Sequence, residues 1–516
     1  MVKDIKLNNY LLNIAAIIFS VIALCCLLKD YTLSHASNFF NLADIKISWD
    51  YCSSFFYTLP LLSIPVLIFS KGYFDALGYS LYKKLVIFLS IIASIASFYL
   101  VIFSANLFTL FIGYELLTIC TIPLIITKYS KEEKVALRHY LIILIATSTT
   151  LFLPALLILQ NILGNTDFAE GGVLLDKISN NDAIILLLLF FFGVAKAAIY
   201  PFHNWMLHAM IAPHPISAII HGVIVVKAGV ISLLKIILYI FGRNYITYLI
   251  HFNVWLLFIP AFGAVYSGIK ALGQNEIKKI LAYSTISQLN FIILLALTVK
   301  DINIVNELIL SHAILKVTLF LTAGYFYIKH KATTLKDISG VIKQSYLTSV
   351  IFIVVSFSMM GLPLLSGGIV KAQIVSNTLE LEISSLIFCC SILTSSYLLK
   401  ILFHMIFLPA SKTHVINRKL HLVTMRLSLL ICVSAEFFLI LHMTTNNSIA
   451  AYKKFAIQLT LASIVTLLSY IIKLENWINN KSFLNVRMNW LITKVEISQS
   501  LQTIILFISL IIFMNI

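Results

Sequence analysis

Charged residues are scarce in this sequence. Only 11% of its 516 residues are Asp, Glu, Lys or Arg, whereas 60% are hydrophobic, and the mean hydropathy is +0.98. Water-soluble domains usually carry about 25% charged residues, so the composition excludes a soluble globular protein and predicts a chain that uses lipid as its solvent. The apolar runs are long and poor in glycine, which favours helices over the shorter, alternating strands of a barrel. We therefore expect an all-α polytopic membrane bundle.

Motifs for redox centres and nucleotides are also absent. None of the seven cysteines forms a C-x-x-C pair, and no G-x-G-x-x-G or Walker A motif is present. Six of the cysteines lie inside apolar segments, where free cysteine usually behaves as a small hydrophobic residue. We therefore expect no cofactor and no metal site on this chain, and we expect any coupled redox or ATP chemistry to reside on another chain.

Hydrophobic segments recur along the whole chain. A transmembrane helix needs about 20 mostly apolar residues, and about fifteen segments satisfy that requirement, so we expect about 14–15 transmembrane helices. We predict spans at 10–28, 54–70, 84–104, 107–127, 136–160, 183–201, 216–240, 249–270, 280–298, 305–328, 346–366, 383–408, 425–443, 455–473 and 500–516. The polar stretch 474–498 fits either an interfacial amphipathic helix or a plain connecting loop.

The net charge of +16 is distributed unevenly between alternate loops. One side carries most of the basic residues, among them Lys128, Lys131, Lys278 and Lys279, whereas the other has few and includes the acidic loop around Glu170. This bias is the positive-inside pattern, which predicts a cytoplasmic N-terminus and a multi-pass protein of the inner (plasma) membrane. We expect the basic surface to face the lipid bilayer's anionic headgroups, and we expect no nucleic-acid partner.

Two places interrupt the helical pattern, and each adjoins a lysine. The first is VAKAAIYPFHNWMLHAMIAPHPISAIIHG at 194–222, which contains Lys196, and the second is GLPLLSGGIVKAQ at 361–373, which contains Lys371. Interrupted segments in corresponding halves of a transporter point to its ion site, and they survive in lipid only where protein or a water-filled cavity satisfies the freed backbone groups. The residues predicted to break the helices are Pro201, Pro213, Pro215, Pro363, Gly367 and Gly368.

Three further charged residues lie near the middle of predicted spans, namely Glu115, Lys227 and Lys316. A charge at the bilayer centre costs about 2.5–3.5 kcal/mol on insertion scales, so each needs a compensating reason. One interpretation is that the lysines extend to the headgroup layer or form static ion pairs. The functional interpretation is a chain of ionisable groups, in which movement of Glu115 relative to Lys196 loads and releases a proton.

Two histidines extend this functional interpretation. His312 precedes Lys316 by four residues, which places both on one face of a helix. His221 follows the first interruption. Because the ordinary pKa of histidine is near 6.5, either residue could relay protons between lysines. The alternative is that they are hydrogen-bonded packing residues.

The segment KAAIYPFHNWMLHAMIAPHPISAIIHGVIVVKAG resembles the signature of the antiporter-like membrane subunits. This family is shared by respiratory complex I (NADH:quinone oxidoreductase), the Mrp-type multi-subunit cation/proton antiporters and membrane-bound hydrogenases. The resemblance continues through GYELLTICTIPLI, QNEIKKILAYSTISQLNF, SHAILKVTLFLTAG and GLPLLSGGIVK, and it covers roughly residues 105–375.

The resemblance implies two inverted five-helix repeats, each with a broken helix. It places the N-terminal helices in 1–104, the first repeat in 105–240, the second in 249–408 and the C-terminal helices in 409–516. The roles that it implies are a Glu115–Lys196 pair, then His221 and Lys227 on the next helix, Lys316 with His312 as the central relay, and Lys371 on the exit side.

The sequence also departs from the family pattern. The usual Trp-Leu-Pro-Asp after the first break is replaced by Trp205, Met206, Leu207 and His208. The common Lys-Asp-Glu after the second break is Lys371, Ala372, Gln373, which lacks two carboxylates, and Tyr114 stands where tryptophan is frequent. These departures favour a divergent antiporter subunit over a standard complex I subunit.

Four functions are therefore considered. The first is a proton-translocating subunit of an Mrp-type monovalent cation/proton antiporter, not catalytic by itself, with other membrane subunits as partners and sodium or potassium as the candidate counter-ion. The second is a proton-pumping subunit of complex I or a related hydrogenase. The third is a non-conducting scaffold subunit of such a complex, and the fourth is a self-sufficient transporter of an organic substrate.

Overall fold

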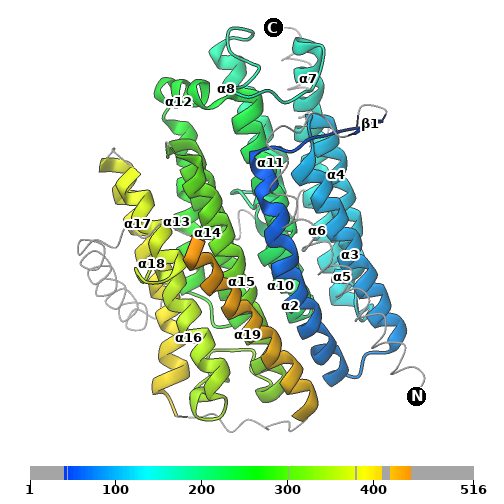
Figure 1. The fold of residues 1–516 in the computed structure, drawn as a ribbon, viewed down its shortest axis with the longest axis vertical. Coiled ribbons are helices and arrows are strands. Elements are labelled where there is room, and N and C mark those ends of the chain that lie inside the picture. The colour runs from blue at the N-terminus through cyan, green and yellow to red at the C-terminus, as the bar shows by residue number, and fades with distance from the viewer. Residues whose placement is uncertain (1–39, 43–44, 300, 378–380, 410–418, 443–516) are drawn as a thin grey trace.

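The structure is a computed structural model that describes residues 40–42, 45–299, 301–377, 381–409 and 419–442. Most of its helices run along the long axis of the molecule, side by side (Figure 1). Within these residues, ten helical segments are long and apolar enough to cross a membrane. The prediction of an all-α polytopic membrane bundle is confirmed.

The chain order begins with a short antiparallel hairpin, in which Phe40 pairs with Ile47. Helices follow almost without interruption. The elements are β1 (Phe40–Leu42), β2 (Ile45–Ile47), η1 (Tyr51–Ser54), α2 (Phe55–Ala76), α3 (Leu81–Phe103), α4 (Leu107–Cys120), α5 (Ile122–Ile125), α6 (Lys131–Thr147), η2 (Ser148–Phe152), α7 (Leu153–Leu163), α8 (Asn180–Gly193), η3 (Ala195–Ala197), α9 (Asn204–His208), η4 (Ala209–Ile211), α10 (His214–Ala218), η5 (Ile219–Val223), α11 (Val225–Lys235), η6 (Ile236–Phe241), α12 (Arg243–Phe252), α13 (Trp255–Leu272), α14 (Ile277–Thr298), α15 (Ile302–His330), η7 (Val341–Lys343), α16 (Tyr346–Met360), α17 (Ser366–Asn377), α18 (Leu381–Phe407) and α19 (Lys419–His442).

The predicted spans agree with these helices. The ten long segments and two shorter apolar helices, α8 and α16, together account for every predicted span from 54–70 to 425–443. The predicted spans 10–28, 455–473 and 500–516, and the polar stretch 474–498, lie outside the described residues. Hydropathy locates these helices because backbone groups in lipid must be satisfied within the segment itself.

Local capping explains where α6 begins. The Ser130 side chain accepts a hydrogen bond from the Glu133 amide at 3.1 Å, and the Glu133 carboxylate accepts one from the Lys128 amide at 2.7 Å. This arrangement closely resembles the capping box, in which a serine and a glutamate three residues later satisfy each other's free amides. Glu133 is buried because of this role.

The two breaks lie where the sequence predicts them. The first separates α8 from α9 and contains Pro201, and the second separates α16 from α17 and contains Pro363. In Figure 1, α8 enters from the upper end of the bundle and α16 from the lower end, so the two broken helices run in opposite directions. Gly367 and Gly368 lie in the first turn of α17, directly after the second break.

Pro213 lies in the short non-helical gap between η4 and α10, where a helix break is predicted, whereas Pro215 lies inside α10 and does not break it. Pro213 is the N-cap of α10 and Pro215 lies in its first turn. Proline is tolerated at these positions because the first amides of a helix have no intrahelical partner to lose. These two prolines therefore begin the membrane span that carries His221.

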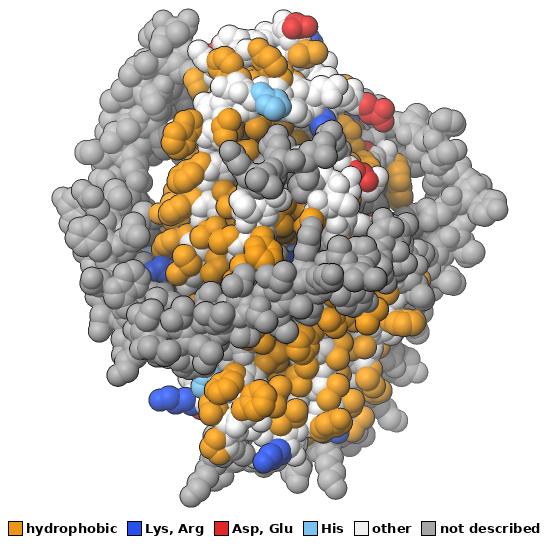
Figure 2. All heavy atoms as spheres, turned by 90° about the vertical axis from the view of Figure 1, so that its left-hand side faces the viewer, with side chains coloured by type: hydrophobic (Ala, Val, Ile, Leu, Met, Phe, Trp, Pro, Cys, Tyr) orange, Lys and Arg blue, Asp and Glu red, His pale blue; other side chains and the backbone are white. Residues whose placement is uncertain are grey.

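The core of the bundle is formed by α14 and α15, which are buried along most of their length. Helix α15 packs against α2, α10, α14, α16, α17 and α19. The face shown in Figure 2 is largely hydrophobic between its two ends, with acidic side chains toward the upper end and most basic ones toward the lower end. That face has the surface expected of a protein surrounded by lipid.

Candidate functional site

Lys196 lies inside the first break, in η3, and is 0% exposed. Its Nζ donates hydrogen bonds of 2.7 Å to the Tyr114 carbonyl and of 2.7 Å to the Thr118 hydroxyl, both on α4. The ammonium also lies 3.2 Å from the centroid of the Tyr114 ring, a cation–π contact. The side chain therefore does not extend to the headgroup layer, and the surrounding protein holds the charge in place of water.

The break is stable because neighbouring side chains satisfy its backbone. Trp205 Nε1 donates to the Ala195 carbonyl at 2.8 Å, and Asn290 Nδ2 donates to the Ala198 carbonyl at 3.0 Å. Ala198 adopts a positive φ of 54°, which ends the turn. These contacts fulfil the requirement that protein replaces lost helical hydrogen bonds at membrane depth.

Helix α11 packs directly on the backbone of this break. A Cβ atom at Gly229 would overlap the Ala197 nitrogen and the Lys196 carbonyl carbon. Only glycine permits this approach without moving the helix or the break. The contact holds α11, the helix that carries Lys227, against the first broken helix.

Glu115 lies on α4 and is half-buried. Its Oε1 atom is buried without a hydrogen-bond partner, and within the described part of the chain no ion pair joins it to Lys196. The Lys196 ammonium contacts the preceding residue, Tyr114, and Thr118 instead. The structure therefore brings the predicted pair onto adjacent elements but not into direct contact.

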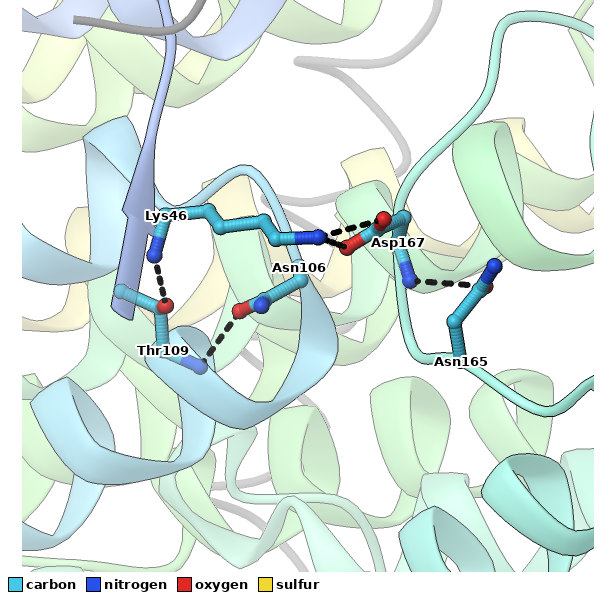
Figure 3. Close-up of polar contacts among 5 residues, drawn as sticks. All are labelled: Lys46, Asn106, Thr109, Asn165 and Asp167. Carbon is cyan, nitrogen blue, oxygen red and sulfur yellow. Dashed lines mark hydrogen bonds and ion pairs between the residues drawn. The ribbon is translucent and has the colours of Figure 1, made fainter. Parts of the chain in front are cut away.

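The start of α4 is anchored by contacts between distant segments (Figure 3). Asn106 caps the helix by accepting from the Thr109 amide at 2.7 Å, and the Thr109 hydroxyl accepts from the Lys46 amide at 2.9 Å. Lys46 Nζ in turn pairs with Asp167 at 2.6 Å. These contacts link β2, α4 and the loop after α7, and they fix the helix that carries Glu115.

His221 is fully buried in η5, between the first broken helix and α15. Its ring stacks on Trp205 at 6.3 Å and on Phe320 at 5.7 Å between centroids. Neither ring nitrogen has a hydrogen-bond partner. Hydrogen bonding therefore does not account for the buried position of this imidazole. Its stacked ring is compatible both with packing and with proton relay.

A line of ionisable groups crosses from α11 to α15. Lys227 Nζ lies 2.5 Å from His312 Nδ1, and both side chains are buried. Lys316 is one helical turn beyond His312 and is 0% exposed. Its Nζ donates to the Ser284 hydroxyl and, at 3.3 Å, to the Leu281 carbonyl. Neither lysine extends toward a headgroup layer, so the predicted central cluster is assembled inside the protein.

Lys371 occupies a different setting, at the second break. It is half-buried, and its Nζ donates to the carbonyls of Met359 and Met360 at 3.1 and 3.0 Å. These are the last carbonyls of α16, whose C-cap residue, Gly361, has a φ of +110°. A cation at a helix C-terminus satisfies free carbonyls and complements the helix dipole. Lys371 therefore caps α16, and its exit role stays a prediction.

A comparison with known protein families matches the region of the chain that contains these residues. The family described as "NADH:quinone oxidoreductase/Mrp antiporter, TM" matches residues 104–396, more than half of the chain. This chain belongs to that family. The matched range includes both breaks and every residue of the predicted relay.

Curated relatives include subunits of an NADH-quinone oxidoreductase and of a probable K(+)/H(+) antiporter. The chain is 29% identical to "NADH-quinone oxidoreductase subunit L" of Buchnera aphidicola subsp. Schizaphis graminum over 63% of this chain and 53% of that protein. It is 32% identical to a probable K(+)/H(+) antiporter protein of Rhizobium meliloti over 36% of this chain and 18% of that protein. The chain spans about half the length of the curated relatives it matches.

Solved structures share the fold at lower identity. A chain of the membrane-bound sulfane sulfur reductase, an archaeal respiratory membrane complex, superposes with a TM-score of 0.67 at 21% identity, covering 88% of this chain and 93% of that one. The Mrp complex from Dietzia sp. DQ12-45-1b gives a TM-score of 0.67 at 18% identity, covering 88% and 53%. These similarities establish the fold of this family member.

Sequence reasoning missed a buried ion pair near the end of α11. Lys235 is 0% exposed, pairs with Asp50 at 2.8 Å and donates to the Ser104 carbonyl at 2.8 Å. A signal was available, because Lys235 follows Lys227 by eight residues within one apolar run. Its partner, Asp50, lies far away in the sequence, between β2 and α2, and no local pattern points to it.

A cavity of about 570 Å³ lies beside the first broken helix of this family member. It is lined by Lys131, Glu132, Val135, Ala136, Leu207, His208, Met210, Ile211, Glu276, Lys278 and Lys279. Lys278 donates to the carbonyls of Met210 and Ala212, which again places a lysine on free carbonyls near a helix end. The lining combines charged side chains of α6 and of the start of α14 with residues of the broken segment, so the cavity places polar groups beside the break.

Proposed function

We propose that this chain is the proton-translocating membrane subunit of a larger complex. The observation that carries the proposal is the line of buried ionisable groups Lys227, His312 and Lys316, in which the first two are 2.5 Å apart. Within the described residues none of these groups forms an ion pair with a carboxylate. Uncompensated charge is costly in a low-dielectric interior, so groups in this setting are suited to taking up and passing on protons.

The route that we propose starts at the first break. Its first two charged groups are Lys196, which is held against α4, and Glu115 on α4, and His221 lies between the broken helix and α15. Protons then pass through Lys227, His312 and Lys316 toward the second break. The cavity beside α9 and the start of α14 supports water access to the first half of this route.

For the complex itself, we propose the Mrp type. Two features support this choice, namely the loss of carboxylates at Ala372 and Gln373 and the 32% identity to the probable K(+)/H(+) antiporter protein. In such an assembly the partners would be other membrane subunits, and sodium or potassium would move against the proton. The second candidate is a redox-driven pump, which is favoured by the relatives named NADH-quinone oxidoreductase subunit L.

The decisive experiment for translocation is Lys316→Met in the native complex. Methionine keeps an unbranched side chain of similar length and removes the ionisable group, so we expect proton flux into membrane vesicles to fall at least tenfold. Lys83→Met is the matched control, because that lysine is exposed near the start of α3 and lies outside both the relay and the cavity lining. Unchanged flux with Lys316→Met would contradict the relay and would favour a non-conducting scaffold.

The type of complex is tested by purifying the tagged chain from native membranes in mild detergent. Co-purification with small membrane proteins alone, together with sodium- or potassium-driven proton flux, is the result expected for an antiporter. Iron–sulfur and flavin subunits in the purified complex would overturn the Mrp assignment and establish the redox pump. The outcome of this purification does not affect the interpretation of the Lys316→Met experiment.

A further inference from the structure

A buried carboxylate from α19 lies against the second break. Glu436 is 4% exposed, and its Oε1 accepts three hydrogen bonds, from the Ser358 hydroxyl at 2.8 Å, the Ser366 hydroxyl at 2.6 Å and the Ser366 amide at 3.3 Å. Its other oxygen, Oε2, is buried and has no hydrogen-bond partner. Within the described part of the chain, no lysine, arginine or histidine forms an ion pair with this group.

The carboxylate bridges the two halves of the broken helix. Ser358 lies in the last turn of α16, and Ser366 is the first residue of α17. The halves are in close contact there, because a Cβ atom at Gly367 would overlap the Ser358 carbonyl oxygen. Glu436 therefore faces the point where the membrane helix is interrupted.

A hydroxyl chain connects this carboxylate to the helix of the central relay. The Ser366 hydroxyl lies 2.8 Å from the Ser311 hydroxyl, and Ser311 is the neighbour of His312 on α15. Because a hydroxyl group both donates and accepts hydrogen bonds, the hydrogen bonds along these two serines can point in either direction. The second break is thereby connected to α15 through Ser366 and Ser311.

Helix capping explains only half of this geometry. A carboxylate at the start of α17 stabilises the free Ser366 amide and complements the helix dipole, and Oε1 alone fulfils that role. An unpartnered, buried carboxylate oxygen costs free energy unless a cation or a proton neutralises it. The buried, unpartnered Oε2 therefore indicates that the carboxylate binds a ligand in addition to capping α17.

We propose that Glu436 is a proton-binding site of the second break, a proposal that rests on the proposed proton translocation by this chain. Uptake forms an O–H bond on Oε2 with a proton taken from hydronium, and release breaks that bond and returns the proton to water, with no change of oxidation state. A proton fits better than a metal cation, because both serine hydroxyls and the amide direct hydrogens at Oε1. A sodium ion would need several oxygen lone pairs turned toward it.

The first test is labelling with dicyclohexylcarbodiimide, which reacts with protonated carboxyl groups in apolar surroundings. We expect mass spectrometry of the native complex to show an adduct on Glu436 at neutral pH, none in Glu436→Gln, and none on the exposed Asp301. Sodium added at constant pH should leave the labelling unchanged. Absence of an adduct on Glu436, or protection by sodium, would overturn the proposal. Labelling needs no transport, so it also separates this proposal from the translocation it rests on.

The second test measures proton flux in vesicles. Glu436→Gln keeps the size and the acceptor oxygen and removes the ionisable group, so we expect at least a tenfold loss, with partial recovery in Glu436→Asp. Ser434→Ala, on the exposed side of the same helix, should leave flux unchanged. Wild-type flux in a correctly assembled Glu436→Gln complex would show that the residue is a cap only, while the Lys316→Met result would stand unaffected.

Discussion

Lys227 and His312 should share one proton and act as a single unit. Their nitrogens are 2.5 Å apart, and two positive charges at that separation repel by about 7 kcal/mol at an effective dielectric constant of about 20. Because about 1.4 kcal/mol corresponds to a factor of ten, double protonation is disfavoured by about five powers of ten relative to isolated groups. We therefore expect at most one of the two groups to be charged at a time, so that an arriving proton displaces one already present.

This sharing makes a quantitative prediction for a double-mutant cycle. We expect Lys227→Met and His312→Gln to lower proton flux by similar factors, and the double variant to be no slower than the slower single one, since either change removes the same transfer step. Independent groups would instead give the product of the two factors. Flux is measured in vesicles that contain the whole complex, with protein amount and assembly checked for each variant.

The reasoning would be refuted by multiplicative losses or by wild-type flux in one single variant. His404→Gln is the matched control, because that half-buried histidine lies on α18 beside Ser339, outside the relay. We expect this control to retain wild-type flux.

Two further predictions concern the elements that hold the relay in place. Asp50→Asn should destabilise the protein by about 3–5 kcal/mol, because it leaves the buried Lys235 ammonium without its counter-charge. Adding Lys235→Met should recover most of that loss, as measured by thermal unfolding in detergent. An unchanged melting temperature in the Asp50→Asn variant would contradict the pairing. Gly229→Ala should cost about 1–3 kcal/mol through overpacking and reduce proton flux, because its Cβ would overlap the Ala197 nitrogen. Ser232→Ala is the control on the same helix, because it removes only the hydrogen bond from the Ser232 hydroxyl to the Ala228 carbonyl. Equal effects of the two changes would argue against the close contact at Gly229.

The membrane class, the spans within the described residues and both breaks followed from the sequence alone. Hydropathy and proline are local signals, and lipid forces each span to satisfy its own backbone, so these features needed no knowledge of the partners. The burial cost of a charge is likewise independent of the detailed fold. For that reason Lys196, Lys227 and Lys316 could be singled out as unusual, and His312 could be placed one turn from Lys316.

The contacts of those charges were decided by the tertiary structure. Lys196 binds α4 through residues about eighty positions away, at Tyr114 and Thr118, and not through Glu115. Lys371 caps α16, and Glu436 reaches the second break from 70 residues beyond Ser366. Such partners are set by which helices pack together, and a composition or a local pattern carries no record of that. The sequence by itself therefore identified most of the charges that burial in a membrane makes costly, and the packing of the helices decided which groups contact them.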